Sequence, residues 1–210
     1  MKTFETWAAI VGIAALTCSG TSKAALVDRG GGMIYDTVQN ITWLADLNYA
    51  QTSGFDSDGR MSWATANAWA NALVFNGYSG WRLPTSDQCF GNCTGSEMGH
   101  LFMTDLGDRL GESVLNPAGD TLQQIANLSM FSNVQSYNYW SGTDSVQFAP
   151  GFATMEFSTS SGDQNAFGKD SLLYAVAVHS GDVAAAVPEP STLLLLGLAV
   201  AGLGGLRRRG

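Results

Sequence analysis

Residues Gly77–Thr85 read GYSGWRLPT and combine two glycines, a tryptophan, an arginine and a proline. The segment lies between a stretch with helical spacing and a region of loops and short strand-like runs, which predicts a corner that turns a helix back into the core. We expect the Trp81 side chain to be buried at this corner, because an indole buries roughly 200 Å² and needs a partner for its N–H. Arg82 needs a carboxylate partner if it is buried. We therefore predict a structural corner, with a ligand-contacting surface as the alternative.

The stretch before this corner, Ser62–Phe75, has the spacing of a helix of about three turns. Ser62 is a favourable N-cap residue. Apolar side chains at helical spacing predict one buried stripe, formed by Trp63, Ala66, Ala70, Leu73 and Val74. Trp69 falls off this stripe, and Gly77 is expected to end the helix.

A second helix is predicted over Glu97–Leu106, with Ser96 as its N-cap and Gly107 at its end. Its expected apolar face consists of Met98, Leu101, Phe102 and Leu106. A further short helical piece is expected around Leu122–Leu128.

Short strands are predicted at both ends of the region. Leu26–Asp36 reads as a hairpin about three glycines, which tolerate positive φ, and Val38–Leu44 follows with Trp43 in the core. Further strand-like runs, separated by turns at Gly142, Ser161-Gly162-Asp163 and Gly168, are Tyr137–Ser141, Phe148–Phe157 and Leu172–His179. We expect Leu172, Tyr174, Val176 and Val178 to share one face. Helices combined with terminal strands that pair indicate the α+β class.

Three of these segments together resemble the Lcl C-terminal domain family over about residues 26–180. The residues that carry the resemblance are Trp63, Trp81, Arg82, Leu83, Pro84, Tyr139, Trp140 and Ser141. The resemblance implies a single C-type-lectin-like domain with two helices and short antiparallel strands, over residues 25–182. It also implies a distant similarity to formylglycine-generating enzymes.

The N-terminal residues 1–24 have the order of a secretory signal peptide. Lys2 precedes the apolar run Trp7–Leu16, and small residues around Ala24 and Ala25 form the expected cleavage site. The apolar run is shorter than the ~20 residues that a spanning helix needs. We therefore predict an exported protein.

The C-terminal end combines an Ala-rich linker over residues 183–187 with a tripartite block over residues 188–210. The block starts with Pro188, Glu189 and Pro190, continues with the apolar run Leu193–Leu206, and ends with Arg207, Arg208 and Arg209. The apolar run predicts a short membrane helix, and the arginines hold its end in the cytoplasm. The order of these features resembles the PEP-CTERM sorting signal, which implies processing by exosortase. A simple tail anchor is the alternative.

The charge of the expected mature domain restricts its partners. Residues 25–187 hold five lysines and arginines and sixteen carboxylates, which gives a net charge of −11. Nucleic acid is disfavoured as a partner, because phosphate binding needs clustered Lys and Arg. Cations, neutral glycans and basic proteins fit this charge better.

Two small motifs suggest chemistry. Asp56 and Asp58 begin a loop like that of a calcium-binding EF-hand, but Arg60 stands at the third acidic position. We therefore expect an acidic turn, and keep calcium at Asp56 and Asp58 as the alternative. Cys89 and Cys93 are the two cysteines left after signal removal, and in an exported protein this favours a disulfide over a redox or metal site.

No catalytic motif is present, and neither His100 nor His179 has another His or Cys at ligand spacing. We predict a non-catalytic protein without a cofactor, sorted to the outer surface or extracellular matrix, that binds exopolysaccharide or another surface protein. The alternatives are an envelope glycan-acting enzyme, which would use carboxylates such as Asp56, Asp58, Asp105 and Asp108, or a formylglycine-generating-type oxidase.

Overall fold

The computed structural model describes residues 26–184, so the predicted signal peptide (1–24) and sorting block (188–210) lie outside the described residues. The larger of two antiparallel sheets has, in spatial order, the strands β1 (Leu26–Asp28), β2 (Met33–Asp36), β3 (Ile41–Leu44), β8 (Val178–Ser180) and β4 (Trp81–Arg82). The smaller sheet has the strands β5 (Asn138–Asp144), β6 (Ala153–Ser158) and β7 (Gln164–Gly168). Within residues 26–184, no helix is long and apolar enough to cross a membrane.

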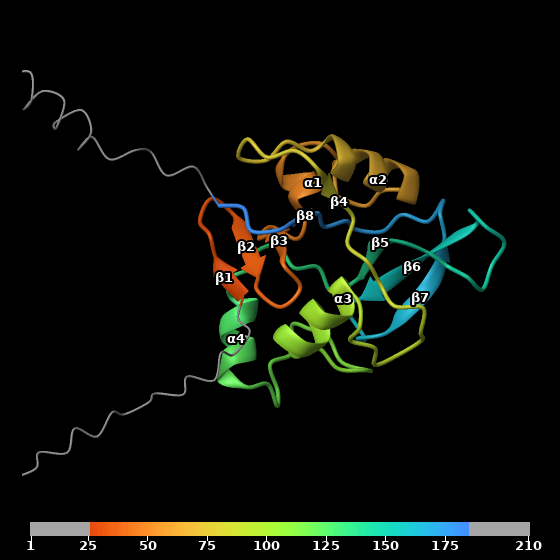
Figure 1. Ribbon diagram of the computed structural model, residues 1–210. Coiled ribbons are helices and arrows are strands. Elements are labelled where there is room, and N and C mark those ends of the chain that lie inside the picture. The colour runs from red at the N-terminus through yellow and green to blue at the C-terminus, as the bar shows by residue number, and fades with distance from the viewer. Residues whose placement is uncertain (1–25, 185–210) are drawn as a thin grey trace, which may run out of the picture.

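Helices lie on both sides of the larger sheet. Figure 1 shows α1 (Tyr49–Thr52) and α2 (Trp63–Ala72) above it, and α3 (Glu97–Gly99) and α4 (Leu122–Leu128) below it. A π-helix, η1 (His100–Asp105), continues directly from α3. Helices packed on antiparallel sheets confirm the predicted α+β class.

The N-terminal hairpin forms as predicted. β1 pairs with β2 in antiparallel register, and Gly30, Gly31 and Gly32 in the connecting turn all have positive φ. β3 pairs on its other edge with β8, so the two ends of the domain meet in one sheet. Trp43 on β3 is fully buried in the core, as its sequence context indicated.

Helix α2 begins where predicted but ends earlier. The Ser62 side chain accepts a hydrogen bond from the Thr65 N–H, while the chain already leaves helical geometry at Leu73. The buried stripe therefore contains Trp69, which is 4% exposed, and excludes Val74, which is 65% exposed. Both assignments from the sequence were wrong: the helix ends before Val74, and Trp69 lies in one buried cluster with Trp81 and Leu83. Gly77, which was expected to end this helix, instead has positive φ in the turn between Phe75 and Tyr78.

The corner at β4 is a structural one. Trp81 is 1% exposed, and its Nε1–H donates to the carbonyl oxygen of Tyr78 at 2.9 Å. Arg82 donates two hydrogen bonds to the Glu97 carboxylate, at 2.7 and 2.5 Å. Burial opposes ionisation of Glu97, yet the hydrogen bonds from Arg82 and Thr85 hold its pKa below the usual value. This pair joins β4 to the start of α3.

The second predicted helix is present, but most of it has π rather than α geometry. Ser96 caps its start, and the four residues of the expected apolar face are all buried. Leu106 N–H donates to the Leu101 carbonyl at 2.9 Å, five residues back, which widens the turn. The short helix α4 has the bounds that the sequence predicted, and Thr121 and Gln124 form a capping box at its start.

The smaller sheet differs from the prediction at three places. Gly142 lies inside β5 instead of in a turn, and its N–H donates to the Pro84 carbonyl at 2.8 Å. β6 begins at Ala153, and Phe148 and Phe152 before it are exposed. β7 was not predicted as a strand.

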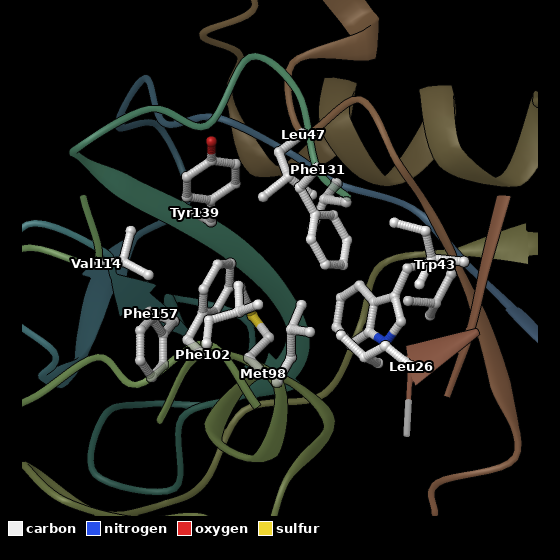
Figure 2. Packing of buried hydrophobic residues seen from close by; sticks show 14 of the residues in the cluster. Leu26, Trp43, Leu47, Met98, Phe102, Val114, Phe131, Tyr139 and Phe157 are labelled. Atoms are coloured by element: carbon white, nitrogen blue, oxygen red, sulfur yellow. The ribbon is translucent and has the colours of Figure 1, made fainter. Parts of the chain in front are cut away.

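Two hydrophobic cores lie on opposite faces of the segment that leads into β8. Val176 and Val178 belong to the core that also holds Trp43, whereas Ala175 and Ala177 belong to the second core. Figure 2 shows part of the first core, where Phe102 lies beside Phe157 with ring centroids 4.8 Å apart. The alternation in this segment was predicted correctly except at Leu172, which is 54% exposed.

Candidate functional site

A polar pocket of about 340 Å³ lies between η1 and α4. Its lining contains hydroxyl, amide, imidazole and carboxylate groups, from His100, Thr104, Asp105, Thr121, Gln123, Gln124 and Asn127. Thr104, Thr121 and Gln123 are exposed, so their polar groups are accessible to a ligand from solvent.

Two amide side chains of α4 hold the pocket together. Asn127 Nδ2 donates to the Asp105 carbonyl at 2.8 Å, and Gln124 Nε2 donates to the Thr104 carbonyl at 3.2 Å. These carbonyls belong to the last turn of η1, where backbone acceptors have no partner within the helix. The amides therefore cap η1 and fix α4 beside it, which keeps the opposite pocket walls in register.

Three potential ligand side chains meet beside this pocket. Asp36 comes from β2, and His100 and Asp105 come from the two ends of η1. One ligand atom from each residue lies within 4.8 Å of the other two, and within residues 26–184 this is the one such group of three His, Cys, Asp or Glu side chains. His100 Nε2 and Asp105 Oδ2 are 3.5 Å apart, and both atoms are buried without a hydrogen-bond partner.

The environment of this cluster disfavours an ionised Asp105. Burial raises the pKa of Asp105 to about 6, and the nearby Asp36 carboxylate contributes in the same direction while His100 opposes it. Asp36 is 1% exposed and accepts hydrogen bonds from the N–H groups of Val38 and Gln39 and from Gln39 Nε2. The site thus holds one carboxylate that is fixed by hydrogen-bond donors and one, Asp105, whose Oδ2 faces His100 without a hydrogen bond.

The residues of the family resemblance have structural positions. Trp63 Nε1 donates to the Ser141 carbonyl at 2.9 Å, and Trp140 Nε1 donates to the Met61 carbonyl at 2.7 Å. All eight side chains are buried or half-buried beside α2, β4 and β5. They join the helix to both sheets and do not line the polar pocket. They are therefore packing residues within the described region.

The remaining sequence candidates lie elsewhere. Cys89 and Cys93 form a disulfide, as predicted. Asp56 and Asp58 lie in an exposed turn, where Asp56 Oδ1 accepts from the N–H groups of Asp58 and Gly59 at 3.0 and 2.8 Å. The acidic turn is thus present, and calcium binding to it stays a prediction. The sorting residues Pro188, Glu189, Pro190, Arg207, Arg208 and Arg209 lie outside the described residues.

Of the four carboxylates considered for glycan hydrolysis, Asp105 lines the polar pocket and the other three do not. Asp108 is 4% exposed, and burial raises its pKa to about 8. Glu156, which the sequence analysis did not consider, is fully buried on β6. Burial raises the pKa of Glu156 to about 8, and Asp163 contributes to the increase, while Asn138 and the Asn165 backbone offset only part of it.

A second depression, of about 330 Å³, lies beside the C-terminal end of α2. Its lining is largely apolar and includes Phe55, Trp69 and Val74, but it holds no titratable side chain. The pocket between η1 and α4 is therefore the better candidate for specific recognition of polar ligands.

The absence of another His or Cys at ligand spacing gave no sign of the cluster around His100. His100 lies on η1, its side chain is 20% exposed, and it faces Asp105. The partners of His100 are an aspartate five residues later and one on a distant strand, so the spacing of His and Cys residues does not indicate them. Only the π-turn brings His100 and Asp105 together.

Comparison with known proteins concerns the C-terminal end. Residues 186–209 match the PEP-CTERM protein-sorting motif, in agreement with the order of features in the sequence. No curated protein matches the chain. The chain therefore carries a PEP-CTERM sorting signal, which implies an exported protein of the cell envelope or surface that exosortase processes.

Proposed function

We propose that the exported domain is a non-catalytic binding module for neutral exopolysaccharide, and that the pocket between η1 and α4 is its binding site. The observation that carries this proposal is the pocket lining, which presents hydroxyl, amide and carboxylate groups from two helices. Sugars are recognised through hydrogen bonds to such groups. Export through the sorting signal brings the domain to the compartment where exopolysaccharide occurs.

The pocket residues fall into two groups, those that hold η1 in place and those that face solvent, and this supports the proposal. Gln124 and Asn127 are engaged in holding η1, so they act as a scaffold. Thr104 and Gln123 are exposed on the two facing helices. Gln123 Nε2 donates one hydrogen bond to Asn127 Oδ1 at 2.9 Å and has a second N–H to offer a ligand. A sugar ring placed between them would accept from and donate to both walls.

The net charge narrows the ligand class. The mature domain carries a net charge of −11, so acidic polysaccharides are repelled at low salt. A neutral glycan avoids this penalty. A surface protein with a basic face is the second partner class that this charge favours.

The proposal is tested by a glycan array with the purified protein, with and without calcium. We expect retention on neutral glycans, and about fivefold weaker binding after Gln123→Ala, because one hydrogen bond contributes about 1 kcal/mol. Gln147→Ala is the matched control, since Gln147 is also exposed and does not line the pocket. Equal affinity of both variants, or retention on no neutral glycan, would contradict the proposal. Release of shortened sugars would favour the enzyme alternative.

Processing is tested separately. Protein extracted from the surface of a host that has exosortase should begin near Ala25 and lack Arg207–Arg209. Intact-mass spectrometry measures both ends at once. Two unprocessed termini in surface-extracted protein would rule out this route.

A further inference from the structure

The cluster of Asp36, His100 and Asp105 has the composition of a transition-metal site. It combines one imidazole nitrogen with carboxylate oxygens, and imidazole is the ligand type that favours zinc and its neighbours over calcium or magnesium. The three side chains come from strand β2 and the two ends of η1, which pack against each other in the same core region.

The distance between the two unpartnered atoms fits tetrahedral coordination. His100 Nε2 and Asp105 Oδ2 are 3.5 Å apart. Two ligands at about 2.1 Å from a zinc ion with a tetrahedral angle between them are about 3.4 Å apart, whereas an octahedral right angle gives about 3.0 Å. Both atoms are buried and have no hydrogen-bond partner, although buried polar atoms nearly always have one. A bound cation would satisfy both.

Hydrogen bonds orient the Asp36 carboxylate, which would be the third ligand. Its Oδ1 accepts from the N–H groups of Val38 and Gln39, and its Oδ2 accepts from Gln39 Nε2 at 2.7 Å. Gln39 Nε2 also donates to the Glu97 carbonyl, which links the turn after β2 to the helix that carries His100. Oδ2 keeps a lone pair for a metal. Ligating carboxylates are commonly oriented by such outer hydrogen bonds.

The π geometry of η1 explains how His100 and Asp105 meet. In a π-helix the hydrogen bonds join residues five positions apart, so residues i and i+5 lie over each other. In an α-helix these two side chains would point about 140° apart, because each residue turns the chain by about 100°. Such π-turns frequently occur at functional sites.

We propose that Asp36, His100 and Asp105 bind one zinc ion, with the fourth coordination position open toward the polar pocket. His100 and Asp105 also line that pocket, which gives the ion a path from solvent. Three protein ligands and one open position are the arrangement of zinc sites that bind an exchangeable ligand. A water molecule or a hydroxyl group from a pocket ligand fits this position.

The test uses the full chain in detergent, purified without a polyhistidine tag and dialysed against zinc. Elemental analysis should find about one zinc ion per chain. His100→Gln and Asp105→Asn should each weaken zinc binding by at least about 100-fold, since even changes to outer hydrogen bonds cost up to about that much. His179→Gln is the matched control, because His179 is the other histidine and lies outside the cluster. Circular dichroism checks that the variants fold.

Cobalt substitution provides a second measurement on the unaltered protein. Co²⁺ should give the intense visible absorption of a tetrahedral site, and zinc should displace it. Zinc content near zero, unchanged affinity in both ligand variants, or a weak octahedral cobalt spectrum would overturn the proposal and leave His100 and Asp105 as an ion pair. These measurements contain no glycan, so the failure of zinc binding and the failure of polysaccharide binding are distinguishable.

Discussion

The substitution Glu156→Gln should make the domain more stable at alkaline pH. Glu156 is fully buried on β6, and its pKa is raised from 4.5 to about 8. Because the folded-state pKa lies above the unfolded-state value, the folded protein keeps this carboxyl protonated at pH 5, and its stability falls as the pH rises through 8. Glutamine has nearly the same shape and never ionises.

The size of the effect follows from the shift in pKa. Each pKa unit corresponds to about 1.4 kcal/mol. Between pH 5 and pH 9, the folded state binds one proton more than the unfolded state over about three pH units. The stability of Glu156→Gln relative to the parent should therefore increase by roughly 4 kcal/mol over this range, a large part of the 5–15 kcal/mol that a domain has. Asp108, which titrates in both proteins, cancels in the comparison.

The measurement is urea unfolding at pH 5 and pH 9, followed by tryptophan fluorescence. Glu112→Gln is the control, because the side chain of Glu112 is 44% exposed and its removal relieves no buried charge. If the stability difference between Glu156→Gln and the parent is the same at both pH values, the carboxylate is solvated or paired on ionisation. Such a result would refute the prediction that burial destabilises the ionised form of Glu156.

Two further predictions concern the corner and the disulfide. Trp81→Ala should destabilise by about 3–5 kcal/mol through loss of a buried indole; Arg82→Leu should cost about 2 kcal/mol by stranding the Glu97 carboxylate, and thermal melts like the parent's would contradict both. Cys89 and Cys93 should resist thiol labelling without reductant, and reduction should cost about 2 kcal/mol, as expected for a short closed loop. Strong labelling of the native protein would exclude the bridge.

Local signals in the sequence predicted most of the elements. Ser62, Ser96 and Thr121 each accept a capping hydrogen bond at a helix start, which is a short-range interaction within a few residues. The glycine turn after β1 is equally local. Such features depend on neighbours in the chain, so a single sequence contains them.

Features that depend on distant contacts were missed. Trp69 is buried in the second core together with Trp81 of β4 and Ala177 of the segment that leads into β8, which periodicity within the helix did not reveal. Asp36 and His100 are separated by two strands and three helices in the sequence, and only the tertiary fold brings them together. The π-turn that places Asp105 beside His100 likewise has no signal in residue spacing. The candidate site was therefore not predictable as a site, although Asp105 was considered.

The central place of β8 determines when the domain can finish folding during export. β8 lies between β3 and β4, and the segment before it supplies side chains to both cores, so neither core is complete until Ser180 has emerged from the membrane. The matched sorting motif begins at residue 186, and the five residues between Ser180 and the motif span at most about 18 Å. We therefore expect completion of the sheet and arrival of the sorting segment at the membrane to fall close together in time during export.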